Sequence, residues 1–263
     1  MIEVFSSGGG TQSACISALI VQGLLPKPDI FAIADTGRER GTTWEYLNQV
    51  IIPAMQSVGV EVHRIGPEWK SVPAHGRDYQ SHNENTLLLP LFTDQSGEVG
   101  KLSGFCSKSW KVEVVNRYLS QVFGITRSQY RKWIGFSLDE WRRVQRMMCG
   151  EEYKKGQIRF PLVSDVPLKR HEAIRTVERM GWPEPPRSRC FDCPNQLDEE
   201  WIEVKEQAPE EFSLAVERDR EIRLIDPHAW MHKTCVPLDQ VDFSREPTLF
   251  DPGQYCSSGV CFV

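Results

Sequence analysis

The prediction of the fold starts from one glycine-rich stretch near the N-terminus. It reads FSSGGGTQS, Phe5-Ser6-Ser7-Gly8-Gly9-Gly10-Thr11-Gln12-Ser13. It follows a short apolar run, Ile2–Phe5, and precedes an apolar helical segment, Ser13–Gln22. Three glycines let the backbone curl and expose successive N–H groups, and a following helix adds its positive N-terminal end. The stretch therefore predicts a cradle for phosphate or pyrophosphate, with a plain glycine turn as the alternative.

The chain continues with the same alternation of strands and helices. Ile30–Ala34 is predicted as a second buried strand, Val60–Ile65 as a third and Trp133–Phe136 as a fourth. Between the second and third strands, apolar residues recur from Leu47 to Val58 at the spacing of one helical face. Further helices are expected at Trp110–Phe123, Leu168–Met180 and Asp198–Gln207. This order predicts an α/β fold, a parallel sheet with helices on both faces of the Rossmann-like kind.

The domain organisation is predicted from a change in composition near residue 183. Residues 1–183 are expected to form the α/β domain, with a long irregular segment at 66–104. Residues 184–263 are expected to be an irregular, cysteine-containing extension with proline-rich turns, packed on the same domain. Only one polar helix, Asp198–Gln207, is expected in this extension.

Composition and charge narrow the classes of function. The chain has 263 residues and a net charge of −5, which argues against a protein that coats nucleic acid non-specifically. The segment from Arg127 to Arg159, however, contains nine Lys or Arg residues and only four Asp or Glu residues. This stretch is either a solvated helical surface or a contact face for a polyanion. No apolar run approaches the roughly 20 residues of a membrane helix, and no signal-like N-terminus is present, so we expect a cytoplasmic protein.

Asp35-Thr36-Gly37 ends the second predicted strand and should lie beside the glycine loop in a parallel sheet. A carboxylate in this place can bind ribose hydroxyls or Mg²⁺. The alternative is a helix-capping turn, because Asp and Thr both cap helices well.

Eight cysteines are a high number for a reducing compartment, where clustered cysteines indicate metal or sulfur chemistry. Cys190 and Cys193 form a Cys-x-x-Cys pair, which is compatible with zinc, an iron–sulfur cluster or a redox disulfide. Cys15 lies in the apolar helix after the glycine loop and is predicted to be a small buried hydrophobe. Cys149 follows two methionines and is also predicted to pack in the core.

Several segments, in order, resemble the phosphoadenosine phosphosulfate (PAPS) reductase family of the adenine nucleotide α-hydrolase-like superfamily, whose members bind pyrophosphate at a PP-loop. The resemblance spans nearly the whole chain. Its segments are SSGGGTQSA, FAIADTGRERGTTWEYL, GFCSKSWKVEVVNRYL, IGFSLDEWRR, RFPLV, SRCFDCPN and HAWMHKTCVPLDQ.

The resemblance implies that residues 6–13 and 35–37 bind an adenine nucleotide, either ATP or an adenylyl sulfate. It places Lys111 at the phosphate or sulfate, and the guanidinium forks of Arg142 and Arg143 suit the same anion. The loop departs from the family pattern Ser-Gly-Gly-x-Asp-Ser, because Gln12 stands in the Asp position and Gly8 in the first Ser position. We expect Asp35 to supply the missing carboxylate.

For the cysteines, the resemblance implies that Cys106 joins Cys190 and Cys193 as ligands of a [4Fe–4S] cluster. Cys235 is the first candidate for the fourth ligand, followed by Cys149 or a cysteine of the tail. A structural zinc site is the alternative. Cys256 and Cys261 lie near the C-terminus, where the family carries its catalytic cysteine, and are either attacking thiolates or idle thiols.

Three functions follow from these observations. In the first, ATP activates an acceptor with release of pyrophosphate, and sulfur is then transferred with the help of an iron–sulfur cluster. In the second, a thiol reduces an adenylyl sulfate to sulfite. The third is a non-catalytic nucleotide-binding component with a structural zinc site. The acceptor could be tRNA, DNA or a small molecule, and the sequence does not decide between them. A sulfur-donor or reductant protein could be a partner, and the chain could form a homodimer.

Overall fold

The computed structural model describes residues 1–70, 79–80 and 87–243. Cys256 and Cys261 lie outside the described residues. The chain divides into two compact units, which are described separately below. The first unit is formed by Met1–Trp69 and Val114–Arg189, and the second by Lys70–Glu113 and Cys190–Val263. The unit boundary follows residue 189, and residues 70–113 group with the C-terminal part of the chain.

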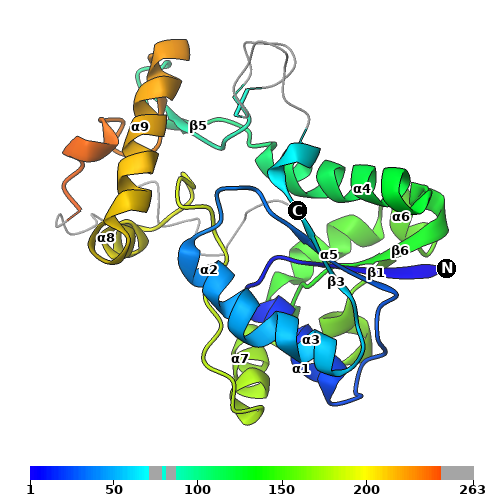
Figure 1. Ribbon diagram of the computed structural model, residues 1–263. Coiled ribbons are helices and arrows are strands. Elements are labelled where there is room, and N and C mark those ends of the chain that lie inside the picture. The colour runs from blue at the N-terminus through cyan, green and yellow to red at the C-terminus, as the bar shows by residue number, and fades with distance from the viewer. Residues whose placement is uncertain (71–78, 81–86, 244–263) are drawn as a thin grey trace. The chain divides into compact units, whose positions relative to one another are not determined.

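The first unit contains a five-stranded parallel sheet in the order β3-β2-β1-β6-β7 (Figure 1). The strands are β1 (Ile2–Ser7), β2 (Ile30–Ala34), β3 (Val62–Ile65), β6 (Tyr130–Trp133) and β7 (Ile158–Arg159). The central strand β1 pairs with β2 on one side and β6 on the other, so that Phe5 lies between Phe31 and Trp133. The predicted α/β fold with a parallel sheet is confirmed.

Helices cover both faces of this sheet, as a parallel sheet requires. The helices of the unit are α1 (Thr11–Val21), α2 (Gly41–Tyr46), α3 (Ile52–Ser57), α4 (Glu113–Phe123), α5 (Trp141–Met148), α6 (Glu151–Lys154) and α7 (Arg170–Arg179). One apolar core joins Phe5 and Trp133 to α1, α3 and α7. A second core joins Val4 on the opposite face to Val115 and Leu119 of α4. Each strand therefore alternates its side chains between two buried faces.

The helix between β2 and β3 is longer than the periodicity predicted. It begins at Gly41 and contains a π-helical turn, Leu47–Ile51, between α2 and α3. Pro53 lies in the first turn of α3 and has no backbone N–H to donate. The π-helical turn before it is wider than an α-helical turn and accommodates the hydrogen bond that the proline cannot make. Leu47, Ile51 and Met55 are buried, which confirms the predicted apolar face.

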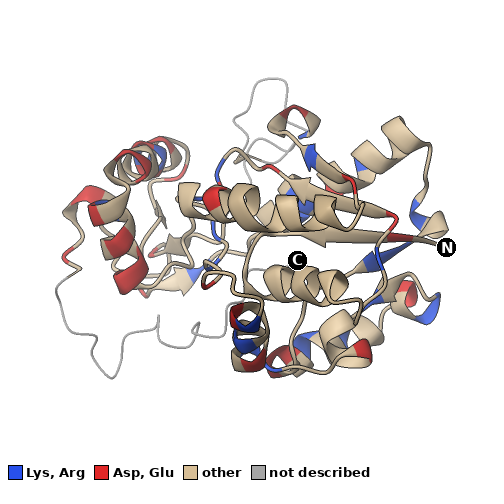
Figure 2. Cartoon of the chain, turned by 60° about the horizontal axis from the view of Figure 1, so that its bottom comes forward, with Lys and Arg blue, Asp and Glu red and all other residues tan. Residues whose placement is uncertain are grey.

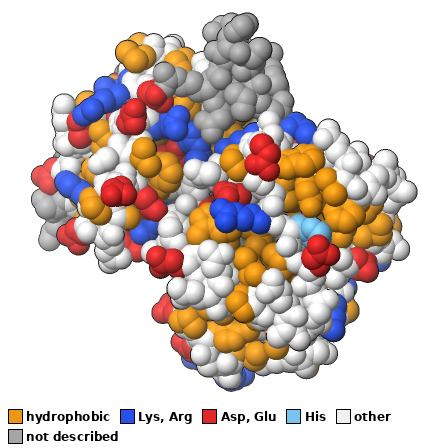
Figure 3. All heavy atoms as spheres, in the orientation of Figure 1, with side chains coloured by type: hydrophobic (Ala, Val, Ile, Leu, Met, Phe, Trp, Pro, Cys, Tyr) orange, Lys and Arg blue, Asp and Glu red, His pale blue; other side chains and the backbone are white. Residues whose placement is uncertain are grey.

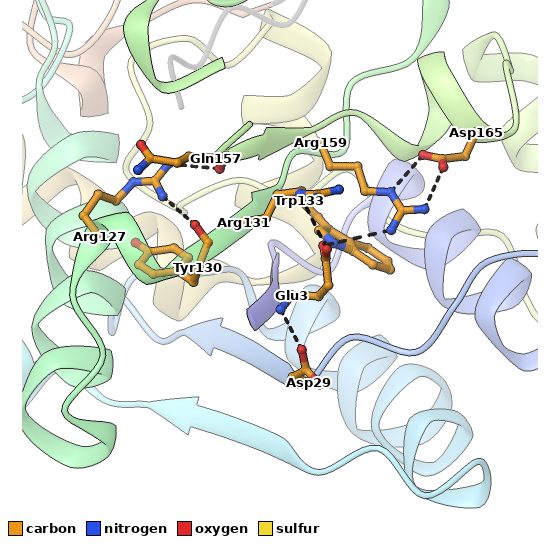
Figure 4. Close-up of polar contacts among 9 residues, drawn as sticks. All are labelled: Glu3, Asp29, Arg127, Tyr130, Arg131, Trp133, Gln157, Arg159 and Asp165. Atoms are coloured by element: carbon orange, nitrogen blue, oxygen red, sulfur yellow. Dashed lines mark hydrogen bonds and ion pairs between the residues drawn. The ribbon is translucent and has the colours of Figure 1, made fainter. Parts of the chain in front are cut away.

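The fourth predicted strand lies at Tyr130–Trp133, not at Trp133–Phe136. Polar residues concealed it, because Arg131 occupies a sheet position directly opposite Glu3 of β1. Figure 4 shows Glu3 among three side chains: Trp133 Nε1 donates to Oε2 over 2.6 Å, Arg131 Nε lies 3.5 Å from Oε1, and Arg159 Nη1 lies 4.0 Å from Oε2. The charges in these strands are thus matched across the sheet.

Apolar side chains also reach the surface of the first unit. Figure 3 shows hydrophobic side chains gathered over α4, where Val122 and Phe123 are 51% and 41% exposed. None of the helices in the described part of the chain is both long and apolar enough to cross a membrane.

The second unit has its own apolar core. It contains α8 (Asp198–Gln207), α9 (Pro209–Ile225) and a small antiparallel sheet of β4 (Phe92–Thr93), β5 (Gly100–Lys101) and β8 (Ala229–Trp230). Its core joins Leu88–Leu91 of the internal segment to Trp201 of α8 and Ile222 of α9. Figure 2 shows acidic residues on α8 and α9.

The prediction that the chain is irregular beyond residue 207 was wrong for its described part. Helix α9 follows directly, and its apolar face is interrupted by Asp219. This carboxylate is fully buried and accepts bonds from the backbone N–H groups of Met231 and Leu238 and from Arg223. Asp219 concealed the helical pattern in the sequence because it puts a charge in the middle of the buried face. In the structure its carboxylate binds the segment that follows α9.

Candidate functional site

The glycine loop connects β1 to α1 at the carboxyl edge of the parallel sheet. Gly8 N donates to Ser13 Oγ over 3.1 Å, and Gly9 N donates to Ser7 Oγ over 3.2 Å. Gly10 is the N-cap of α1 and has no side-chain capping bond. The backbone N–H groups of the first helical turn, Thr11–Ser13, have no intrahelical acceptor. The loop therefore places donors and the positive end of an 11-residue helix at one point.

This loop lies at the topological switch point of the sheet. From β1 the chain crosses to β2 on one side, and β6 lies on the other side. In an open α/β sheet, ligands bind outside the carboxyl ends of the strands at this point. The segment after β6 closes on the loop, since a Cβ at Gly135 would lie 3.4 Å from Gln12 Cβ.

Two segments form the walls of the loop. A Cβ at Gly10 would lie 3.1 Å from Ser188 Cβ, and one at Gly9 would lie 2.9 Å from Thr43 Cγ2. The segments are also bonded to each other: Ser188 Oγ donates to Glu39 Oε1 over 2.5 Å, and the backbone N–H of residue 40 donates to the carbonyl of residue 189 over 3.1 Å. The glycines are thus needed for close packing as well as for curvature.

Three arginines in these walls are almost fully buried. Arg38, Arg40 and Arg189 are 2%, 6% and 7% exposed. Burying a guanidinium is costly unless it is paired, and each of the three has a polar or electrostatic partner within the protein. Sequence reasoning missed these residues. The available signal was their position, because they directly follow Asp35-Thr36-Gly37 and directly precede Cys190.

The Asp35 turn lies beside the glycine loop, as predicted from the neighbouring strands β1 and β2. Asp35 Oδ1 accepts the N–H of Gly37 over 2.8 Å, and Oδ2 accepts Nη2 and Nε of Arg64 over 2.6 and 3.0 Å. Arg64 in turn lies over the ring of Trp44, with Cζ 3.9 Å from the ring centroid. The carboxylate therefore shapes a turn and holds an arginine.

A different carboxylate contacts Gln12, the residue that stands in the family's Asp position. Gln12 Nε2 donates to Glu140 Oε2 over 3.2 Å, and the same oxygen lies 3.3 Å from Ser137 N. Arg143 Nη1 contacts the other oxygen of Glu140, and its guanidinium lies 4.2 Å from the ring centroid of Phe136. Sequence reasoning missed Glu140, which is 128 residues away from Gln12.

The predicted anion-binding cations come from different elements of the chain. Arg143 approaches the glycine loop through Glu140, and its side chain is 18% exposed. Arg142 is exposed on α5. Lys111 lies in a π-helical turn, Lys108–Val112, of the second unit.

All four predicted ligand cysteines lie in the second unit. Cys193 N donates to the carbonyl of Cys190 over 3.2 Å, which closes the Cys-x-x-Cys turn, and Cys106 packs against the core of this unit. Cys235 has a φ of 50°, an uncommon value for a residue with a side chain, and burial raises the pKa of its thiol to about 11. Within the described residues, no three Cys, His, Asp or Glu side chains are placed to hold a metal ion.

The other cysteines divide into a buried and an exposed thiol. Cys15 is fully buried, as predicted, and desolvation raises its pKa to about 12. The prediction that Cys149 packs in the core was wrong, because this residue is exposed at the C-terminal end of α5. The two methionines before it contact the core instead.

A scan against protein-family models and searches of curated proteins and of solved structures found no match to the chain.

Proposed function

We propose that the first unit binds an adenine nucleotide and belongs to a PAPS reductase-like enzyme that uses ATP to activate an acceptor with release of pyrophosphate. The observation that carries this proposal is the glycine loop at the switch point of the sheet. Its backbone donors and the N-terminus of α1 favour a phosphate or pyrophosphate group.

In this proposal the chain's own residues act mainly by binding and orienting the nucleotide. The N–H groups of Gly10 and Thr11–Ser13 hold the phosphate oxygens. The turn at Asp35–Gly37 lies at the adjacent strand end, where it can meet the ribose or a Mg²⁺ ion. Preorganised donors of this kind stabilise the charge that develops on a departing pyrophosphate.

Glu140 replaces Asp35 in our proposal as the carboxylate that compensates for the neutral Gln12. Both carboxylates pair with an arginine, but only Glu140 is seen to accept a hydrogen bond from Gln12 itself. Glu140 is a positioning residue in this scheme, because it orients the side chain of Gln12 and contacts Arg143. Its carboxylate thereby brings a negative charge to the first turn of α1.

The sulfur-transfer step rests on the second unit. We propose that Cys106, Cys190, Cys193 and Cys235 hold a [4Fe–4S] cluster that supplies sulfur chemistry when bound, with zinc as the alternative metal. Their common unit and the Cys190–Cys193 turn support this assignment. Because the described thiols are not preassembled as a metal centre, the metal content and visible spectrum of anaerobically purified protein test it directly.

The nucleotide site is tested with two serine variants of the same helix. Ser13→Ala removes the acceptor of the Gly8 N–H, while Ser17→Ala, one turn later, removes a buried hydroxyl that has no hydrogen-bond partner among the described residues. We expect Ser13→Ala to weaken ATP binding by about 2- to 13-fold, which corresponds to one hydrogen bond of about 0.5–1.5 kcal/mol. Ser17→Ala should leave it unchanged.

Calorimetric titration with ATP measures this effect, and a pyrophosphate-release assay with candidate acceptors measures turnover. Equal ATP affinity in both variants, or no ATP binding by the unmodified protein, contradicts the proposed site. Tight binding without pyrophosphate release in the presence of any acceptor supports a non-catalytic role instead.

A further inference from the structure

Most basic residues between Arg127 and Arg159 form ion pairs with carboxylates of the first unit. Arg127 pairs with Glu152 over 2.9 Å, and Arg159 pairs with Asp165 over 2.6 Å. Arg131, Arg143 and Lys154 likewise have carboxylate partners. These cations stabilise the fold, so the excess of charge seen in the sequence is not by itself a binding surface.

Helix α5 is the exception within this stretch. Its first residue, Trp141, is 44% exposed, and Arg142 and Arg146 are exposed one helical turn apart. Neither arginine forms an ion pair with any residue that the structure describes. Helix α5 therefore presents an exposed tryptophan and two arginines that have no carboxylate partner among the described residues.

The N-terminus of α7 extends this surface. Leu138 N, just before α5, donates to the carbonyl of Leu168 over 2.9 Å, and Arg170 N donates to Asp139 Oδ2. Lys169 and Arg170 therefore lie next to the start of α5, and both are exposed. We name the set Trp141, Arg142, Arg146, Lys169 and Arg170 the α5–α7 surface.

The α5–α7 surface begins next to the candidate nucleotide site in the chain. The turn that begins α5 contains Glu140, which binds Gln12 in the first turn of α1. Only one residue separates this contact from Arg142. Trp141 therefore directly follows the residue that contacts the first turn of α1.

We propose that the α5–α7 surface binds an unpaired segment of nucleic acid, with Trp141 stacking on a base and the arginines contacting phosphates. Aromatic stacking combined with backbone cations is how proteins bind single strands and splayed RNA loops. The inference rests on the proposed function, because it makes this nucleic acid the acceptor that ATP activates. Single-stranded DNA and an RNA loop share the chemistry required.

The test measures binding of the full chain to fluorescently labelled oligonucleotides by anisotropy. The probes are a 12-nucleotide RNA, DNA of the same sequence and the corresponding DNA duplex. Trp141→Ala should weaken single-strand binding about 5- to 150-fold, the range for loss of one stacked base. Arg142→Ala combined with Arg146→Ala should lower the slope of log K against log salt concentration by about 1.4, or about 0.7 for each phosphate contact.

Arg179→Ala is the matched control for the arginine changes. Arg179 is exposed at the opposite end of α7 and has no ion pair in the described part of the chain. It should lower neither the affinity nor the salt slope. A preference for either single strand over the duplex supports the proposal, and the tighter of the two identifies the acceptor.

The proposal is overturned if Arg179→Ala weakens binding as much as the α5 pair does, if Trp141→Ala has no effect, or if the unmodified chain binds none of the probes. ATP titration of the same variants separates this proposal from the nucleotide site. No ATP binding by the unmodified chain, with intact oligonucleotide binding, would refute only the nucleotide site. Normal ATP binding with no dependence on Trp141 would refute only the α5–α7 surface.

Discussion

Replacing Gly9 by alanine tests whether the glycine loop is held closely by its walls. Gly9 has a φ of 75°, and a left-handed conformation costs a non-glycine residue about 1–2 kcal/mol. The added Cβ would also lie 2.9 Å from Thr43 Cγ2 and 3.0 Å from Leu47 Cδ1. Overpacking of this kind costs about 1–3 kcal/mol. We therefore expect the free energy of unfolding to fall by about 2–5 kcal/mol, the sum of the two costs.

Gly23→Ala is the matched control for this change. Gly23 has a φ of 74°, but a Cβ there would meet no atom within 4 Å among the described residues. It should lose only the conformational contribution of about 1–2 kcal/mol. The smaller entropy of the unfolded alanine chain applies to both variants and cancels in the comparison.

Denaturant titration monitored by tryptophan fluorescence and circular dichroism measures both variants. Gly9→Ala should be the less stable of the two by about 1–3 kcal/mol. It should also bind ATP more weakly, because Thr43 and Leu47 must move to admit the Cβ. Equal stability of the two variants would refute the close packing of the loop against Thr43 and Leu47.

Three further changes have defined outcomes. Trp133→Phe removes the indole donor to Glu3 and should lower the free energy of unfolding by about 1–3 kcal/mol, measured by denaturant titration. A hydrogen bond from His232 lowers the pKa of Asp198, so its stabilising contribution is present above about pH 4 and is lost as the pH falls through the lowered pKa. The stability difference between the unmodified chain and Asp198→Asn should therefore shrink below about pH 4. Finally, burial raises the pKa of Cys15 to about 12, so peptide mapping should show alkylation of Cys15 only after unfolding, and modification of the native protein would contradict its burial.

Much of the first unit could be predicted from the sequence because its signals are local. The strand at Ile30–Ala34 has the predicted bounds, and the glycine loop lies between a strand and a helix as expected. In both places, consecutive apolar residues and glycines set the backbone conformation without help from distant residues. Helix α8 of the second unit also has the predicted bounds.

Charged residues within a strand and within a helix defeated the same reasoning. Strand β6 carries Arg131, which is compensated by Glu3, and helix α9 carries Asp219, which is compensated by backbone N–H groups. Neither partner is near in sequence, so the residues looked solvated. Burial of a charge depends on a partner that only the folded chain supplies.

The sequence alone determined the type of the first unit and the position of its glycine loop, because strand, loop and helix are consecutive. Only the tertiary structure decided which carboxylate meets that loop, since Glu140 reaches Gln12 across 128 residues of chain. It also decided that Cys106 shares a unit with Cys190 and Cys193, although a large part of the sheet lies between them in sequence. Such contacts depend on the pairing order of the strands and on a common core, and neither is encoded in any one segment.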